Sequence, residues 1–492
     1  MTKVLLLTCP DIYQHWDKRF IVGPWLGGPL IAGNCLNYEI KVADLVLWRH
    51  DVKKGIDLAM KNFKPDIVGV SAMTFQYPTA KKIGEYLKSH YMKIPTILGG
   101  YHVTASTKEE VVAEVDGIFD FLYAGLAEFS FESFLNAFSN FDLEKMYSIP
   151  GLSFKANGGW IHNKISTECP SLEESALPKR DSRLYKGGFH FIGKNFDTIE
   201  TSKGCNMNCI FCSIKKMITN YAHRPIPWVI EDLKKMKAKR VKSVFLTDDN
   251  PAVDDERFER LLQSIIAQKL NEDMCFSGTF STLKMSNPKT VELMKKANFW
   301  LTFLGVESIE PSILKAQKKA SSEHSAQKAL ENLYDAGIIS LTGIVIGNPN
   351  DTKETIKNLY RFLRESPASY VMPQFLQPYP GTVMREELLA KDLVCNISDW
   401  STYNGAFCQC KTLSGLLPYQ IESITLEEQN NFVIERVKSF SKIKNFVKAN
   451  PLHMAKWILT ETPKLFQNIG KTSEEKAKIS RQKMIQMNQF NI

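Results

Sequence analysis

Short apolar runs alternate with amphipathic stretches over residues 1–140. The apolar runs cover 3–9, 39–47, 66–73, 94–100 and 120–125. They have the length of buried strands, and the spacing of apolar positions between them is typical of amphipathic helices. Short apolar strands separated by helices indicate an α/β fold with a parallel sheet that is covered on both faces. Such a sheet binds its ligands beyond the carboxyl ends of the strands.

A second alternation of the same kind fills residues 196–385. Six strand-like runs recur there with helical patterns between them, at 197–204, 243–250, 274–280, 299–308, 339–347 and 370–378. Six β/α units predict a partial (β/α)6 barrel of the TIM type, with its active site at the carboxyl ends of the strands. Residues 141–195 are rich in Gly, Pro and Ser and are predicted to form a linker, whereas 386–492 is a mostly helical region.

The composition is that of a folded protein outside the membrane-spanning classes. The chain has 492 residues, of which 44% are hydrophobic and 23% charged, so a sizeable core is expected. No apolar run reaches the roughly 18–20 residues that span a bilayer. The first apolar run is interpreted as a strand and not as a signal peptide, which predicts a cytoplasmic location. The ten cysteines are therefore expected to be free or metal-bound and not paired in disulfides.

The net charge of +9 is concentrated near the C-terminus. Residues 433–492 carry twelve Lys and Arg against four Asp and Glu, a net charge of +8. Within this basic tail, residues 440–466 mix Lys with Phe, Ile, Leu and Trp, which favours an amphipathic element lying on the inner face of a membrane. A helical cap on the barrel is an equally good interpretation. Nucleic-acid binding is disfavoured, because the catalytic regions show no interleaving of basic and aromatic residues.

Three cysteines lie within eight positions directly after the first strand-like run of the second region. They are Cys205, Cys209 and Cys212, and Gly204 precedes them. A structural zinc site takes four protein ligands, whereas a cubane iron–sulfur cluster held by three thiolates keeps one iron open for another ligand. This density favours a cluster site over three unrelated buried cysteines.

The cysteine spacing, with Phe211 before the last cysteine, resembles the signature of the radical S-adenosylmethionine (SAM) enzymes. Further segments resemble that family in the same order, namely Asp248-Asp249-Asn250, Gly305-x-Glu307-Ser308, the strand with Gly343 and Gly347, and 377–382. The resemblance implies that the three cysteines bind a catalytic [4Fe–4S] cluster whose open iron chelates SAM. It implies that segment 248–250 helps to hold the SAM amino group. It also implies that Gly305, Glu307 and Ser308 lie near the ribose and carboxylate of SAM, that the strand with Gly343 and Gly347 packs by its adenine, and that 377–382 is the closing loop. A solvated turn is the alternative for 248–250.

The order of loops in the N-terminal region resembles the flavodoxin-like (Rossmann-type) cobalamin-binding domain of class B radical SAM enzymes. The resemblance assigns cobalamin contacts to Ser71, Thr74, Phe75, Gly99, Gly100, His102, Gly125 and Glu128. The family's G-E-G-E segment is Gly-Leu-Ala-Glu here, and its D-x-H-x-x-G motif is absent, so no histidine of that motif binds cobalt. A structural role is the preferred interpretation of His102. No G-x-G-x-x-G follows the first strand, which disfavours a dinucleotide but leaves open a domain without cofactor.

The resemblance implies a cobalamin-dependent radical SAM methyltransferase that acts on an unactivated carbon of a lipid, a tetrapyrrole or another natural-product precursor. An external electron donor of the flavodoxin or ferredoxin type is part of this hypothesis. One alternative is an oxidative cyclase of the anaerobic magnesium-protoporphyrin monomethyl ester type. Another is a binding protein that senses cobalamin or redox state. A second cluster on Cys395, Cys408 and Cys410 has little support from their spacing.

Overall fold

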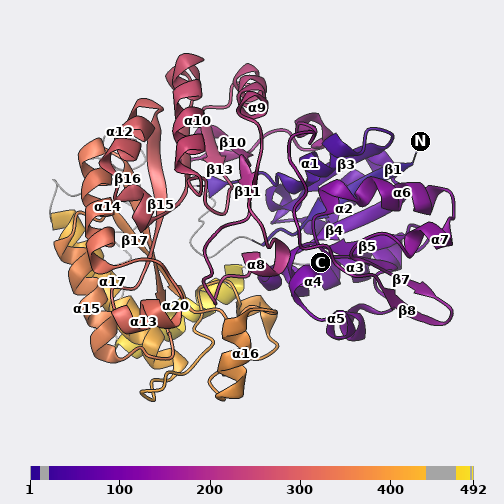
Figure 1. Cartoon of the computed structure of the whole chain (residues 1–492). Helices are drawn as coiled ribbons and strands as arrows, with labels where there is room; N and C mark the ends of the chain where they lie inside the picture. The colour runs from indigo at the N-terminus through magenta and orange to yellow at the C-terminus, as the bar shows by residue number, and fades with distance from the viewer. Residues whose placement is uncertain (1, 12–20, 439–471, 488–489, 491) are drawn as a thin grey trace.

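The fold is built from two parallel sheets that lie side by side (Figure 1). The computed structural model describes residues 2–11, 21–438, 472–487, 490 and 492. In Figure 1 the N-terminal sheet and its helices are indigo to purple, and the barrel follows in magenta to orange. The α/β architecture predicted from the sequence is confirmed.

The N-terminal sheet has seven strands in the order β3-β1-β4-β5-β6-β7-β8. The first five are parallel, and a hairpin of β7 and β8 extends the sheet antiparallel into the segment that the sequence assigns to a linker. The strands are β1 (Lys3–Thr8), β3 (Glu39–Asp44), β4 (Ile67–Ser71), β5 (Thr96–Gly99), β6 (Phe121–Tyr123), β7 (Leu152–Ala156) and β8 (Gly159–His162).

Helices cover both faces of this sheet, as its apolar strands require. In β1, Leu5 and Leu7 enter one core and Val4 and Leu6 the other, because successive side chains point to opposite faces. The helices are α1 (Gly27–Asn34), α2 (Val52–Phe63), α3 (Tyr77–His90), α4 (Tyr101–Ala105), α5 (Lys108–Val115), α6 (Phe131–Ser139) and α7 (Leu143–Met146), with short 3-10 turns η1 (Leu45–Trp48), η2 (Thr74–Gln76) and η3 (Ala127–Phe129).

The second sheet is the predicted partial barrel. Six parallel strands follow one another, and β9 and then β2 continue one edge antiparallel. The strands are β10 (Lys194–Ile199), β13 (Ser243–Leu246), β14 (Cys275–Ser281), β15 (Phe299–Glu307), β16 (Ile339–Ile346), β17 (Tyr370–Phe375), β9 (His190–Phe191) and β2 (Ile21–Val22). Since β2 precedes α1 in the chain, the N-terminal region contributes a strand to the barrel sheet.

The barrel helices pack one apolar stripe each against the strands. The clearest case is α15 (Lys353–Glu365), where Ile356, Leu359, Tyr360 and Leu363 are buried at the spacing of a single helix face. Thr352 caps its N-terminus by accepting a hydrogen bond from the Thr355 amide. The other helices are α9 (Ile226–Ala238), α10 (Asp255–Ala267), α11 (Thr282–Met285), α12 (Pro288–Lys296), α13 (Pro311–Ala316) and α14 (Glu323–Ala336).

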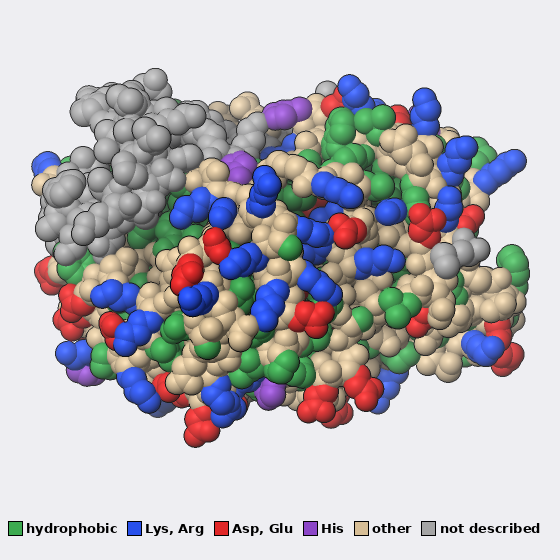
Figure 2. Space-filling model, turned by 90° about the horizontal axis from the view of Figure 1, so that it is seen from above, with side chains coloured by type: hydrophobic (Ala, Val, Ile, Leu, Met, Phe, Trp, Pro, Cys, Tyr) green, Lys and Arg blue, Asp and Glu red, His purple; other side chains and the backbone are tan. Residues whose placement is uncertain are grey.

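The C-terminal region adds helices on the β17 side of the barrel. It contains α16 (Val383–Ala390), η6 (Trp400–Thr402), α17 (Pro418–Lys438) and α20 (Ser473–Met487), and α17 packs on both α15 and α20. The basic amphipathic segment 440–466 lies outside the described residues. Within the described part of the chain, no helix has both the length and the apolar character needed to span a bilayer. On the face seen in Figure 2, Lys and Arg side chains lie among Asp and Glu side chains.

Two linker arginines tie the regions together through a buried carboxylate. Asp197, on β10, accepts hydrogen bonds from Arg183 Nη1 at 2.8 Å and Nη2 at 2.9 Å, and from Arg180 Nε at 3.0 Å. Arg180 also pairs with Asp232 on α9. The amide of Leu184 donates to the Val42 carbonyl on β3 at 2.8 Å. The linker is thereby bound to both sheets.

Replacing Arg183 should destabilise the whole fold. Arg183→Met leaves the buried Asp197 with one cation, so we expect a loss of roughly 3–5 kcal/mol in the free energy of unfolding. Lys239→Met is the control, because its pair with Asp181 is exposed (45% and 73% of the side chains) and is worth less than about 1 kcal/mol. Urea unfolding followed by circular dichroism measures both. Equal losses for the two variants would contradict a role for the buried pair.

Candidate active site

The three cysteines lie on the loop between β11 (Ser202–Lys203) and α8 (Ile214–Met217). All three thiols are half-buried and free. The loop is held at Ile210, whose amide donates to the Gln317 carbonyl and whose carbonyl accepts from the Met384 amide, each at 3.1 Å. These two bonds fasten the cysteine loop to the segments that follow α13 and begin α16.

Two aspartates hold the segment that leads into this loop. Asp248 accepts hydrogen bonds from the Thr201 amide at 2.7 Å, the Thr201 hydroxyl at 2.6 Å and the Ser202 hydroxyl at 2.5 Å. Asp249 accepts from the Gly204 amide at 2.9 Å. Asn250 keeps a buried Oδ1 for which the described residues supply no donor. In this geometry Asp248 supports the loop, and Asp249 and Asn250 retain free acceptor capacity.

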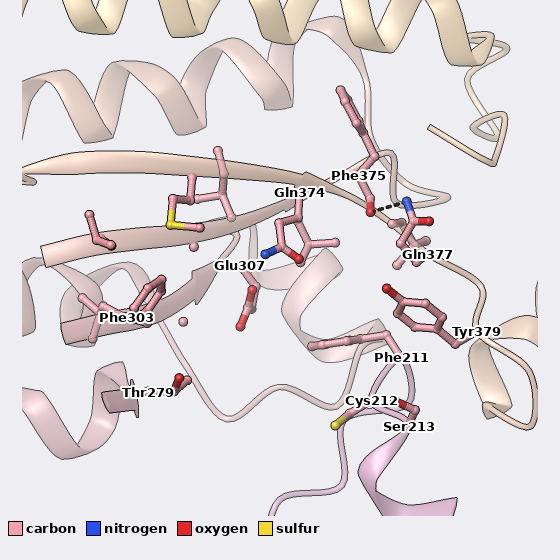
Figure 3. A pocket seen from close by; sticks show the side chains of 18 residues that line it. Phe211, Cys212, Ser213, Thr279, Phe303, Glu307, Gln374, Phe375, Gln377 and Tyr379 are labelled. Carbon is pink, nitrogen blue, oxygen red and sulfur yellow. Dashed lines mark hydrogen bonds between the residues drawn. The ribbon is translucent and has the colours of Figure 1, made fainter. Parts of the chain in front are cut away.

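A pocket of about 370 Å3 runs from the cysteine loop into the barrel (Figure 3). Its wall includes four predicted site residues besides Cys212, namely Phe211, Gly305, Glu307 and Gly343. The rest of the lining is largely apolar and includes Phe303, Leu304, Leu341, Met372 and Phe375. Ser308 and Gly347 lie outside the lining. Gly347 has φ of 88° and donates its amide to Asp351 at 2.9 Å, so it shapes the turn after β16.

A buried ion pair that the sequence did not indicate stands at the pocket wall. Lys319 Nζ lies 2.8 Å from Glu307 Oε1, with 11% and 14% of the two side chains exposed. Glu307 has φ of 63°, an uncommon conformation for a residue with a side chain, where β15 shifts register against β16. Burial opposes the charge of Lys319, but Glu307 and the thiols of Cys209 and Cys212 outweigh it and raise its pKa. Lys319 follows Lys318 in the loop between α13 and α14, and a pair of lysines in such a stretch gives no sign of a buried partner.

The thiols fit a cluster better than a single ion. Burial raises the pKa of Cys212 to about 11 and also raises that of Cys209, so binding of iron must displace their protons. A structural zinc ion takes four protein ligands, whereas a cubane has a separate iron for each thiolate, and Cys212 lines the pocket. Three free thiols beside a pocket therefore fit a [4Fe–4S] cluster with SAM in the adjoining cavity.

The predicted cobalamin residues gather at the carboxyl ends of β4, β5 and β6. Ser71 and Gly99 end their strands, Thr74 and Phe75 form η2, and Gly100 (φ 97°) and Gly125 (φ 90°) turn the chain. Thr74 Oγ1 and His102 Nδ1 are buried and find no partner in the described part of the chain. Unpartnered buried polar atoms along this edge fit a large polar ligand such as cobalamin.

His102 and Glu128 differ from the other candidates in their surroundings. His102 stacks on Tyr77 with 4.0 Å between ring centroids and meets Trp400 edge-on at 5.2 Å. Burial lowers the pKa of His102 to about 3, so the ring is neutral. Glu128 forms ion pairs with Lys203 and Arg224 of the barrel region. The structure thus brings most of the candidates to one edge and directs Glu128 elsewhere.

The three C-terminal cysteines differ from one another in their exposure. Cys395 is exposed, whereas Cys408 and Cys410 are buried. The Cys408 thiol donates to the Cys410 carbonyl at 3.2 Å.

Two family models match the chain in the order that the fold shows. The B12 binding domain model matches residues 21–128, and the Radical SAM superfamily model matches residues 199–363. The first covers the strands with the predicted cobalamin edge, and the second begins at the end of β10 and includes the cysteine loop.

Curated relatives and a solved structure resemble the whole two-domain unit. An uncharacterized methyltransferase of Pyrococcus horikoshii is 27% identical, with 82% of this chain and 86% of the relative covered. Bacteriochlorophyllide d C-8(2)-methyltransferase of Chlorobaculum tepidum is 27% identical (69% and 71%), and anaerobic magnesium-protoporphyrin IX monomethyl ester cyclase of Rubrivivax gelatinosus is 24% identical (69% and 61%). The structure of the cobalamin-dependent SAM radical enzyme OxsB has a TM-score of 0.68 at 13% identity, covering 99% of this chain and 80% of that one.

Replacing Gly204 should prevent cluster assembly without unfolding the protein. Gly204 has φ of 79°, and a Cβ there would overlap the Asn220 carbonyl, so Gly204→Ala must displace the start of the cysteine loop. We expect iron and sulfide per chain to fall at least about tenfold after anaerobic reconstitution.

Gly117→Ala is the matched control for this prediction. Gly117 has the same φ of 79° but nothing within 4 Å of its Cβ position. It should cost only about 1 kcal/mol of backbone strain and keep full cluster content. If both variants lose iron to the same extent, the overlap with Asn220 is not the cause.

Replacing one cluster cysteine should abolish the cluster and SAM cleavage together. Cys209→Ala removes one of three thiolates, so the iron–sulfur absorption and the formation of 5′-deoxyadenosine should both be lost. Cys395→Ala, at an exposed position, should retain both. SAM cleavage by Cys209→Ala at the wild-type rate would contradict the assignment.

Proposed function

We propose that this chain, which belongs to the radical SAM enzymes that carry a B12-binding domain, methylates an unactivated carbon of a largely apolar small molecule. The radical SAM domain implies a [4Fe–4S] cluster and SAM, and the B12-binding domain implies cobalamin. When bound, the cluster and SAM supply one-electron activation of a C–H bond, and cobalamin supplies the methyl group.

The residues of this chain divide these tasks by position. Cys205, Cys209 and Cys212 would hold the cluster, and the pocket beside Cys212 would hold SAM and the reacting part of the substrate. Glu307, fixed by Lys319 at 2.8 Å, offers one carboxylate oxygen toward the pocket (Figure 3). The edge with Thr74 and His102 would hold the corrinoid.

The apolar wall of the pocket is the observation that carries the substrate class. Phe303, Leu341 and Met372 line it, and such a surface binds apolar groups by removing them from water. The same wall excludes water from the reacting atoms, which protects a radical from side reactions. A lipid or a tetrapyrrole pigment satisfies this requirement, and one methyltransferase relative is named for a bacteriochlorophyll-type pigment.

The partners and the location remain part of the proposal. One-electron chemistry requires an external reductant, for which a flavodoxin or ferredoxin is the natural class. Contact with the inner face of a membrane through residues 440–466 and a cytoplasmic location are supported by the sequence alone. An apolar substrate dissolved in a membrane would make such contact useful.

Anaerobic turnover tests the proposed function. Reconstituted protein is incubated with hydroxocobalamin, titanium(III) citrate, SAM carrying a deuterated methyl group and candidate hopanoid or chlorophyll-type substrates. We expect 5′-deoxyadenosine and a product that has gained one deuterated methyl group, measured by mass spectrometry. A product that gains oxygen and no methyl group would instead establish the cyclase alternative. An intact cluster that forms no 5′-deoxyadenosine would indicate a sensor.

A further inference from the structure

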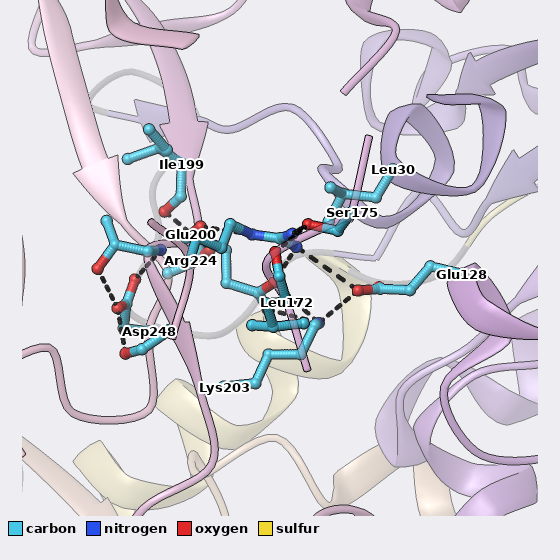
Figure 4. A network of polar contacts seen from close by, with 12 residues as sticks. Leu30, Glu128, Leu172, Ser175, Ile199, Glu200, Lys203, Arg224 and Asp248 are labelled. Carbon is cyan, nitrogen blue, oxygen red and sulfur yellow. Dashed lines mark hydrogen bonds and ion pairs between the residues drawn. The ribbon is translucent and has the colours of Figure 1, made fainter. Parts of the chain in front are cut away.

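Glu128 belongs to the N-terminal domain but directs its carboxylate into the barrel region. It lies in η3, directly after the turn that follows β6. Its Oε1 is 3.2 Å from Lys203 Nζ and 3.5 Å from Arg224 Nη2, and only 9% of its side chain is exposed (Figure 4). Glu128, which was predicted to bind cobalamin, thus forms ion pairs with two cations of the barrel region.

These groups form a closed and buried cluster of four charges. Glu200 lies 2.8 Å from Lys203 and 3.1 Å from Arg224, so two carboxylates face the same two cations. Arg224 is fully buried, and 6% of the Lys203 side chain is exposed. Burial raises the pKa of Glu128, but Glu200 and Glu128 together raise that of Lys203. Removing one carboxylate leaves an excess buried positive charge.

The other three members of the cluster lie on the ribbon that leads into the cysteine loop. Lys203 is in β11, which pairs with β12 (Ala222–His223), and Arg224 follows β12. Arg224 is fixed by the Glu200 carbonyl at 3.1 Å and by Trp228, whose ring centroid is 4.4 Å away. Lys203 stands two residues before Cys205. Any movement of η3 against the barrel would therefore act on the start of the cluster loop.

We propose that Glu128 is a positioning residue that clamps the β6 loop of the B12-binding domain to the β11–β12 ribbon and so fixes the spacing between the corrinoid and the iron–sulfur cluster. This inference rests on the proposed function. In that function a methyl group passes between sites on two domains, so the spacing between those sites matters. Reactions between separately bound groups are sensitive to misplacement of about 1 Å, which can cost about a hundredfold in rate. A buried charge cluster suits this task because it has few alternative low-energy arrangements.

The test compares Glu128→Gln with wild type in three measurements that need no substrate. Hydrogen exchange of the full chain without cofactors should become faster in residues 125–130 and 200–205 and remain unchanged elsewhere. Hydroxocobalamin affinity, by absorption titration, should stay within about threefold. With cobalamin, titanium(III) citrate and SAM, formation of 5′-deoxyadenosine should stay within about twofold, while S-adenosylhomocysteine from methylation of reduced cobalamin should fall at least about tenfold.

Two further variants separate positioning from other effects. Glu114→Gln removes a carboxylate from an exposed pair with Lys81 in the same domain and should change none of the three measurements. The exchange of charges, Glu128→Lys with Lys203→Glu, keeps two carboxylates and two cations and should restore part of the S-adenosylhomocysteine yield that Lys203→Glu alone loses.

Each other outcome overturns the inference. Loss of cobalamin affinity in Glu128→Gln, with unchanged hydrogen exchange, would make Glu128 a cofactor contact. Wild-type behaviour in all measurements would mean that the cluster does not position the domains. If wild type cleaves SAM but methylates no substrate, the proposed function fails, while hydrogen exchange and S-adenosylhomocysteine still decide the role of Glu128.

Discussion

The hydrogen bonds that Asp248 and Asp249 accept from residues 201–204 are the constraint on which the site depends. β10 ends at Ile199, and the cysteine loop begins at Cys205. The position of the cluster ligands relative to the barrel therefore depends on the short segment between them. Its backbone polar groups are buried and need partners. Two aspartates after the neighbouring strand supply acceptors for three of its residues, which fixes the loop before any metal binds.

The strands and the cysteine motif were predictable because their signals are local. Buried strands read as short apolar runs, and the three thiols stand within eight residues. Gly305, Glu307 and Gly343, which the motif order singles out, line the pocket, and their contact with SAM stays a prediction. In each case the sequence neighbourhood decides the structure, so no long-range information is needed.

The ion pairs were not predictable, because no helix or strand period relates the two partners in the sequence. Glu128 meets Lys203 across the domain boundary, and Lys319 meets Glu307 across α13. The motif also gives no sign that Asp248 uses its oxygens within the protein, because an acidic turn that faces a ligand and one that faces its own backbone look the same in sequence. The sequence identified polar residues such as Asp248 at the carboxyl ends of the strands. It did not show which way their side chains point.

Three contacts between the domains differ in their distance from the cysteine loop. β2 adds an N-terminal strand to the barrel edge, and Arg183 binds Asp197 through two hydrogen bonds. Both contacts join parts of the fold that contain no cluster ligand. A change in the conformation of the cysteine loop therefore leaves them in place. The contact of Glu128 with Lys203 is next to the cluster loop. Because β2 and Arg183 join the domains at sites away from the cysteines, the role that we propose for Glu128 is the local one of setting the spacing between the cofactor sites.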